Sequence, residues 1–336
     1  ELRSDRTLSS HWEEGYIRAI TVSGLRRHKS WTILSEFPLL PGQVFELRKA
    51  KRGVAQIYGS EYFDNVTLSV QPSDSGADLT LRVVERSSPQ LRFGAGFSSE
   101  RKGRGFAEFL NDNALGLNAR LSLFGKYGER DEELRARMSF DRLPLQLPYD
   151  RAFGLYTTTD FSLRWLREEY DLFNDEHKPV GSYYFERTGG DLWAGRAFRR
   201  WGSISLGAIG ERILPGGIPG EPAVTRFGPA VRTIIDTKDR YPYPTSGLEV
   251  RGDYEYMWRA HESPGAFNRI TGNVDGYVPL ARRIVARGMA DYGWNDRLLP
   301  VWGLHRLGGE ESLLGLHTAE RLGNVKFSVL GELRYD

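Results

Sequence analysis

The chain has 336 residues, of which 40 % are hydrophobic and 27 % are charged. Its net charge of +2 indicates no nucleic-acid partner. The lack of cysteine excludes disulfides and thiolate chemistry, and no run of about 18 apolar residues occurs that could form a transmembrane helix. The 38 glycines, the 12 % aromatic content and long stretches of alternating polar and apolar residues instead indicate a protein rich in β-strands.

The first 86 residues predict a linker followed by a small α+β domain. Residues 1–14 are polar and are assigned to the linker. Within residues 15–86, Tyr16–Gly24 alternates as a strand does, and two segments with helical spacing of apolar residues follow. The domain closes with a hairpin that turns at Asp74–Gly76. The predicted order is therefore β-α-α-β-β.

Residues 90–336 predict an all-β region of long strands. In Leu248–Trp258, apolar residues or glycine occupy every second position, and most positions between them are charged. The alternating segments run about 9–12 residues, near the length that crosses a bilayer at a tilt, whereas soluble strands average about 5–6 residues. A soluble β-sandwich also alternates and is the alternative. The strand length favours an antiparallel transmembrane β-barrel.

About twelve strands are predicted in this region if residues 181–198 form a single strand. They begin near residues 91, 105, 117, 133, 152, 181, 203, 226, 248, 268, 284 and 325.

The order of the small domain and the strands that follow it resemble the outer-membrane superfamily of BamA, TamA and the two-partner and type V secretion translocators. The small domain is similar to a POTRA domain. The resemblance rests on Val22-Ser23-Gly24, Pro41-Gly42, Ile57-Tyr58, Tyr62–Val66 and the closing Leu79–Arg86. It implies an outer-membrane location with the POTRA domain in the periplasm. The implied partners are membrane lipid and an extended polypeptide.

The resemblance also implies a barrel of about sixteen strands, of which about twelve lie in this chain. Such barrels usually end in an aromatic residue, whereas this sequence ends at Asp336. The C-terminal strands are therefore expected to be missing. The resemblance makes no prediction of the oligomeric state.

A polar turn carries the first barrel motif. The segment from Asp236 to Gly247 resembles the superfamily's Asp-x-Arg-Asp turn, with Lys in place of the commoner Arg. Its aspartates can cap turn amides, and its prolines stop the strand ladder. The motif residues are Asp236, Lys238, Asp239, Pro244 and Gly247.

A glycine- and leucine-rich loop carries the second barrel motif. It follows the strand near 284, where the superfamily has a loop that re-enters the barrel with a Val-Arg-Gly-aromatic tip. In this chain Leu314 replaces the arginine and Leu316 the aromatic residue. The loop resembles that of type Vd autotransporters, which join a patatin-like lipase, one POTRA domain and a barrel. Its motif residues are Gly308, Gly309, Leu313, Leu314, Gly315 and Leu316, and the leucines are expected to be shielded from water.

The resemblance favours a type Vd-like translocator that moves or anchors an upstream passenger. A BamA- or TamA-like insertase is the alternative, with Gly94 and Gly96 weakening the pairing at a barrel seam. Glycine at these positions is also explained if neighbouring lumen side chains need room. A passive pore is a third possibility, because Arg135, Arg137, Asp253 and Glu255 would line the lumen.

No enzyme is predicted within these residues, although a lipase passenger could lie upstream. No Gly-x-Ser-x-Gly, His-Glu-x-x-His or P-loop motif occurs, so no catalytic residue, metal site or cofactor is expected. The histidines are scattered, and those flanking the loop are expected to be polar lining. They are His11, His28, His177, His261, His305 and His317.

Overall fold

A computed structural model describes most of the chain. The described residues are 15–34, 37–59, 62–73, 76–86, 89–114, 119–143, 155–198, 201–239, 243–258, 265–309, 312–313 and 315–335. They fall into two compact units, one formed by Glu1–Ser88 with Asp112–Asn118 and the other by Pro89–Asn111 with Ala119–Asp336. We describe each unit by itself.

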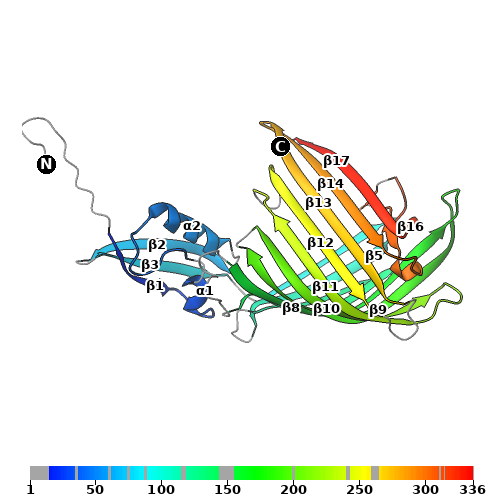
Figure 1. Ribbon diagram of the computed structural model, residues 1–336, viewed down its shortest axis with the longest axis horizontal. Coiled ribbons are helices and arrows are strands. Elements are labelled where there is room, and N and C mark those ends of the chain that lie inside the picture. The colour runs from blue at the N-terminus through cyan, green and yellow to red at the C-terminus, as the bar shows by residue number, and fades with distance from the viewer. Residues whose placement is uncertain are drawn as a thin grey trace, which may run out of the picture. The chain divides into compact units, whose positions relative to one another are not determined.

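The first unit has the predicted β-α-α-β-β order (Figure 1). Its sheet has the order β1-β3-β2, with β1 parallel and β2 antiparallel to β3. Every second residue of β3 from Ala77 to Val83 is buried. Of these, Leu79, Leu81 and Val83 share one core cluster with Ile33, Ala50 and Ile57 of the helices. One face of the sheet therefore forms the core with the helices. The elements are β1 (Ile17–Ser23), α1 (Ser30–Leu34), α2 (Leu47–Tyr58), β2 (Phe63–Ser73) and β3 (Gly76–Glu85).

The second unit is dominated by one twelve-stranded sheet whose strands follow each other in chain order. The twelve predicted strands are confirmed, and the ambiguous segment is the single strand β9. Strands β4 and β5 pair antiparallel, and so does each neighbouring pair from β6 to β17. The strands are β4 (Gln90–Ser98), β5 (Lys102–Ala114), β6 (Ala119–Gly128), β7 (Asp131–Leu143), β8 (Leu155–Phe173), β9 (Pro179–Phe198), β10 (Gly202–Gly216), β11 (Val224–Asp236), β12 (Gly247–Met257), β13 (Phe267–Ala281), β14 (Ile284–Asn295) and β17 (Val325–Tyr335).

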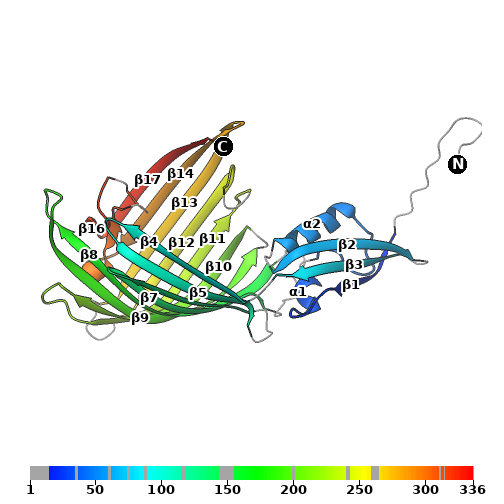
Figure 2. The same cartoon turned by 180° about the vertical axis from the view of Figure 1, so that it is seen from behind.

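The sheet curls (Figures 1 and 2). Its two faces also differ in chemistry. Charged residues share one face, where the register pairs Arg232 with Asp253. Arg187 on β9 and Arg269 on β13 reach the adjacent carbonyls of Trp302 and Gly303, although their strands lie four positions apart in the sheet. Such convergence requires this face to be concave, since neighbouring strands are about 4.8 Å apart.

The convex face is apolar and exposed. On β17 the side chains of Val325, Phe327, Val329, Leu333 and Tyr335 are between 58 % and 74 % exposed. A soluble sandwich would cover such a face with a second sheet. In the part of the chain that the structure describes, the strands instead join one continuous twelve-stranded sheet.

The sheet has two edges, β4 and β17, and each has one neighbouring strand within the described part of the chain. Neither α-helix in the described residues is long and apolar enough to cross a membrane.

Candidate functional site

The concave face of the sheet is covered at one end by the loop between β14 and β17. This loop contains the 3-10 turn η1 (Val301–Gly303) and two short strands, β15 (His305–Leu307) and β16 (Arg321–Gly323), which pair antiparallel. The pairing closes the loop into a hairpin-like stem. The motif residues lie between the two short strands.

Trp302 anchors the loop to the concave face. Its side chain is 2 % exposed, and its ring centroid lies 6.3 Å from that of Phe267 on β13. Leu299 of the loop and Phe185 of β9 belong to the same buried cluster. Burial of a Trp side chain in such a cluster contributes more than about 2 kcal/mol, so it favours the docked loop.

Two arginines of the sheet bind the backbone of the same turn. Arg187 Nη2 donates a hydrogen bond of 2.9 Å to the Trp302 carbonyl, and Arg269 Nη2 donates one of 2.9 Å to the Gly303 carbonyl. Asn295 Nδ2 also donates to the Gly303 carbonyl, at 3.2 Å. The sheet therefore supplies the charge and the loop supplies neutral acceptors.

Acidic residues of the neighbouring strands balance these arginines. Arg226 Nε donates to Glu211 Oε1 at 2.6 Å, and Arg187 lies 3.7 Å from the same oxygen. Arg226 also lies 3.6 Å from Glu255. Removing one member would leave a buried charge without its partner, which costs several kcal/mol. The network thus holds the arginines in place beneath the loop.

Arg306 on β15 brings a cation of the loop to the buried aromatic residues of the concave face. Its guanidinium carbon lies 4.6 Å from the ring centroid of Tyr170 and 5.3 Å from that of Phe185. A desolvated cation–π contact contributes about 2 kcal/mol. Position 314, where the superfamily motif has its arginine, is Leu and lies outside the described residues.

The paired glycines of the loop have backbone conformations that other residues rarely adopt. The φ angles are +118° at Gly308 and +92° at Gly309. A Cβ on Gly308 would lie 2.1 Å from the His317 carbonyl oxygen, whereas a Cβ on Gly315 would meet no atom within 4 Å. Glycine is thus required at 308, and Gly309, with a positive φ and its amide bonded to the Leu316 carbonyl, is similarly constrained.

The leucines of the loop are shielded only in part. Leu313, which forms an isolated bridge with Gly309, is 39 % exposed, so its expected shielding is wrong. Leu316 is half-buried. The apolar contacts that fix the loop come instead from Leu299 and Trp302, at the start of the loop.

The turn motif lies at the opposite end of the sheet, between β11 and β12. Asp239 accepts the amides of Thr245 and Ser246 at 2.9 and 3.1 Å and the Thr245 hydroxyl at 2.5 Å. These bonds, the hydroxyl first, hold the pKa of Asp239 well below its ordinary value of 3.8. Asp236 accepts the Lys238 amide at 3.0 Å, and Pro244 is buried.

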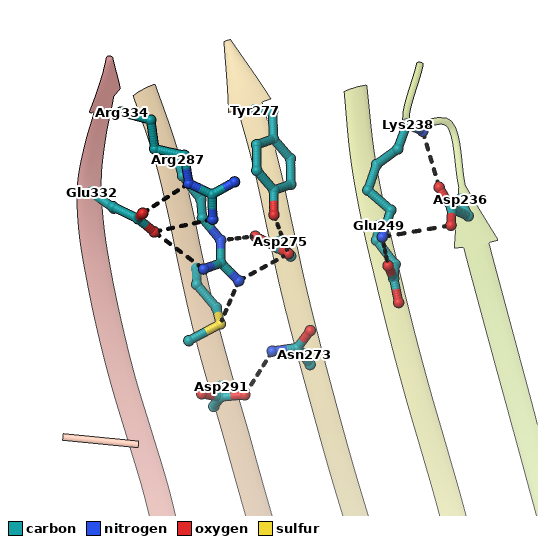
Figure 3. Close-up of polar contacts among 11 residues, drawn as sticks. Asp236, Lys238, Glu249, Asn273, Asp275, Tyr277, Arg287, Asp291, Glu332 and Arg334 are labelled. Carbon is teal, nitrogen blue, oxygen red and sulfur yellow. Dashed lines mark hydrogen bonds and ion pairs between the residues drawn. The ribbon is translucent and has the colours of Figure 1, made fainter. Parts of the chain in front are cut away.

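The last motif residue, Gly247, also requires its glycine. Its φ is +108°, and a Cβ would lie 2.5 Å from the Thr237 carbonyl oxygen. The Lys238 ammonium extends from the turn to Glu249 on the concave face (Figure 3). Lys238 thus ties the turn to β12.

Near this end, the concave face carries a ladder of ion pairs across β13, β14 and β17 (Figure 3). Arg287 Nε donates to Asp275 at 2.7 Å, and Arg287 Nη1 donates to Glu332 at 3.2 Å. Arg334 Nε donates to Glu332 at 2.8 Å. Charges of both signs therefore alternate along the ladder, as they do around the buried arginines.

The seam candidates lie on the edge strand β4. A Cβ on Gly94 would lie 2.6 Å from the ring of Phe106 on β5, whereas a Cβ on Gly96 would meet no atom within 4 Å. Gly94 thus makes room for an aromatic ring on the neighbouring strand. Gly96 has no such packing reason.

Several contacts of the loop had no signal in the sequence. Arg187 and Arg269 are ordinary members of an alternating pattern, and Glu100, which accepts the Thr318 amide of the loop at 3.0 Å, lies in a short turn. Their importance depends on a loop that is distant in the sequence. Among the residues that the structure describes, no group of three or more His, Cys, Asp or Glu side chains could hold a metal ion.

The chain resembles known proteins in one domain and in its fold. Residues 15–86 match the POTRA family, described as surface antigen variable number repeat. BamA from Haemophilus ducreyi lacking POTRA domains 1–3 is similar, with a TM-score of 0.68 and 16 % identity over 94 % of this chain and 64 % of that one. CdiB from Escherichia coli has a TM-score of 0.63 and 16 % identity over 95 % and 61 %.

CdiB from Acinetobacter baumannii has a TM-score of 0.56 and 14 % identity over 96 % of this chain and 60 % of that one. No curated protein matches the chain in sequence. The chain spans between 60 % and 64 % of the length of these solved structures. A POTRA domain followed by an antiparallel sheet of the BamA and CdiB barrel fold is therefore the architecture of this chain.

Proposed function

We propose that this chain is the outer-membrane translocator of a type V secretion protein of the Vd kind, which moves or tethers an upstream passenger. The proposal divides the chain into a linker at 1–14, a POTRA domain at 15–86 and a transmembrane barrel from 90 to 336, part of a barrel of about sixteen strands. Its partners are outer-membrane lipid and an extended polypeptide. It involves no nucleic acid, no cofactor and no enzymatic step within these residues.

The chemistry of the sheet supports a membrane location. Its convex face is apolar and exposed, as on Phe93 and Leu206, while its concave face carries paired charges such as Arg287 and Asp275. A barrel in a bilayer needs this division, because lipid contacts one face and water the other. The POTRA domain would then lie in the periplasm.

The POTRA sheet supports binding of an extended polypeptide along one edge. At the β1 edge, the Ile17 amide donates to the Gln43 carbonyl at 2.8 Å, and the Gly42 amide donates to the Ile17 carbonyl at 2.7 Å. The other edge is β2, whose only strand neighbour in the described part of the sheet is β3. A passing chain can add to β2 as a further strand through backbone bonds that do not depend on its sequence.

The sequence of the loop and its contacts with the sheet favour a translocator over an insertase. The position of the motif arginine is Leu314, and the loop instead docks through neutral carbonyls that accept from Arg187 and Arg269. The loop therefore holds its place on the concave face without the arginine of the insertase motif. An insertase is the second candidate, because no close contact requires glycine at position 96 of the edge strand β4. A glycine there would weaken strand pairing at a barrel seam.

An epitope upstream of residue 15 in the full-length protein tests the proposal. A translocator should carry the epitope to the cell surface, where added protease removes it from intact cells. An epitope in the β8–β9 turn, at residues 174–178, serves as the control for insertion, because this turn lies at the same end of the sheet as the loop. An upstream epitope that stays protected while the turn epitope is cleaved would contradict translocation.

A further inference from the structure

The helix α2 of the POTRA domain carries a basic surface on the side that faces away from the core. Its buried stripe is Ala50, Gly53 and Ile57. Residues that lie four and seven positions apart share one side of a helix, so the exposed residues form two further stripes. One stripe contains Leu47, Lys51 and Tyr58, and the other contains Arg48, Arg52 and Ala55. Together these six residues are the α2 basic surface.

The positive charge of this surface is not balanced within the domain. Glu46 is the only acidic residue between positions 43 and 59, and it pairs with Lys49 at 2.6 Å. In the described part of the chain, the other cations of the helix have neither an ion pair nor a side-chain hydrogen bond. They are Arg48, Lys51 and Arg52.

Two arginines on the sheet of the same domain do have carboxylate partners. Arg18 Nε donates to Asp78 at 2.8 Å, and Arg86 Nε donates to Asp64 at 3.1 Å. The helix side therefore differs from the sheet in that its charge is left for a partner outside the domain. Such a partner has to be anionic, because the three unpaired side chains are all cations.

The apolar members of the α2 basic surface favour a lipid surface over an acidic polypeptide. Leu47 and Tyr58 lie on the same stripe as Lys51 and are 57 % and 54 % exposed. At a bilayer surface, such side chains enter the headgroup region while long cationic side chains reach the lipid phosphates. An acidic polypeptide would use the cations and would leave the leucine in water.

The connection to the sheet keeps the domain near the bilayer in the proposed membrane location. Residues 86–89 alone separate the end of β3 from the start of β4. A chain of this length spans at most about 18 Å. If β4 crosses the bilayer, the POTRA domain cannot leave the neighbourhood of the lipid headgroups. Even weak attraction to them would therefore act on the domain.

We propose that the α2 basic surface binds anionic phospholipid headgroups of the periplasmic leaflet. The proposal rests on the outer-membrane location that is part of the proposed function. Binding holds the helix side of the POTRA domain against the bilayer and leaves the opposite face of its sheet in water. Arg82, between the buried Leu81 and Val83, and Ser69, which pairs with Thr80, lie on that opposite face.

Quenching by headgroup-labelled lipid in vesicles of the full-length protein tests this proposal. Residues 1–336 contain no cysteine, so A55C places a fluorophore on the α2 basic surface and S69C places one on the opposite face. Nitroxide on the headgroup of phosphatidylcholine is the quencher. Quenching at A55C should be at least about twofold stronger in vesicles that also contain phosphatidylglycerol. It should fall at about 1 M salt, where the Debye length is about 3 Å, and S69C should not change.

Two double variants with equal loss of charge separate this surface from the net charge of the domain. Each cation near an anionic bilayer strengthens binding about fivefold, so R48Q/R52Q should lower the ratio of bound to free domain about 25-fold. R18Q/R82Q removes the same charge from the sheet and is the matched control. It should leave the quenching at A55C unchanged.

Equal quenching of A55C in the two kinds of vesicle would overturn the proposal, and so would equal losses in the two double variants. Protection of the A55C label by polyglutamate, without quenching from lipid, would replace the lipid with an acidic polypeptide. The quenching does not depend on a passenger. Lipid binding as expected, in a protein whose upstream epitope stays unexported, would therefore reject the translocator and keep the lipid-binding surface.

Discussion

The paired glycines of the loop show how one residue can decide a local structure. The φ of +118° at Gly308 and the nearby His317 carbonyl leave no space for a side chain. A change at Gly308 therefore acts on the loop through the backbone rather than through a lost side-chain contact.

We expect G308A to destabilise the docked loop by about 1–3 kcal/mol, because alanine is strained at this φ and its Cβ overlaps a carbonyl. G315A is the matched control, since a Cβ at Gly315 meets no atom within 4 Å. Hydrogen exchange of the loop amides measures the difference. Equal protection in G308A and the unmodified chain would contradict the assignment of the loop conformation.

Asp239 predicts a pH dependence at the turn between β11 and β12. Its pKa is lowered in the folded turn, so its contribution is complete above the ordinary value of 3.8 and is lost as the pH falls below it. At about pH 6, D239N should exchange the Thr245 and Ser246 amides faster than the unmodified chain. The difference should narrow steadily as the pH is lowered below 3.8. A difference that is constant across this range would exclude the ionised carboxylate as its cause.

At the scale of elements, the loop is held from the sheet by arginines that donate to carbonyls. R187M removes the arginine donor to the Trp302 carbonyl, which should weaken docking by about 1–3 kcal/mol. R269M leaves the Gly303 carbonyl with the bond from Asn295, so its effect should lie at the low end of this range. The expected result is faster exchange of the amides in Val301–Gly303. R212M changes an exposed arginine of β10 and is the control. Exchange that is unchanged in both R187M and R269M would show that the arginines do not anchor the turn.

The strands could be predicted from the sequence because successive side chains point to opposite faces of a strand. Polar and apolar residues therefore alternate along the sequence. The doubt over residues 181–198 arose because Gly189 and Gly190 interrupt the apolar pattern of β9. A Cβ on Gly189 would lie 2.3 Å from the Gly210 carbonyl oxygen, so glycine is needed where β9 and β10 approach closely. A packing requirement therefore obscured the pattern.

The helices were less predictable in detail. Leu47 and Tyr58 fit the apolar spacing of α2 but are 57 % and 54 % exposed. The buried stripe instead includes Gly53, where a Cβ would lie 2.5 Å from Pro38. A close approach to another segment selects glycine at a position that no hydrophobic pattern marks.

The contacts of the loop could not be predicted from the sequence either. Its place after β14 followed from the sequence, but its anchors did not. Glu100 and Thr318 are 218 positions apart, so only the folded sheet brings them together.

At the scale of the whole molecule, a membrane barrel should tolerate charge on one face only. V329R places a cation on the apolar convex face of β17 and should destabilise the protein in bilayers by about 2–4 kcal/mol. S328R places it on the concave face, where Ser328 lies 3.4 Å from Asp291, and should cost far less. Denaturant unfolding in vesicles compares the two. Equal losses in V329R and S328R would contradict the assignment of the lipid-facing side.

The central claim is that this chain translocates one passenger and does not fold other barrels. Depletion of the full-length protein, followed by quantitative proteomics of outer membranes and of the cell surface, tests it most directly. The account predicts the loss of one surface or secreted polypeptide while other outer-membrane proteins keep their normal levels. A broad fall in outer-membrane proteins would contradict it and would support an insertase.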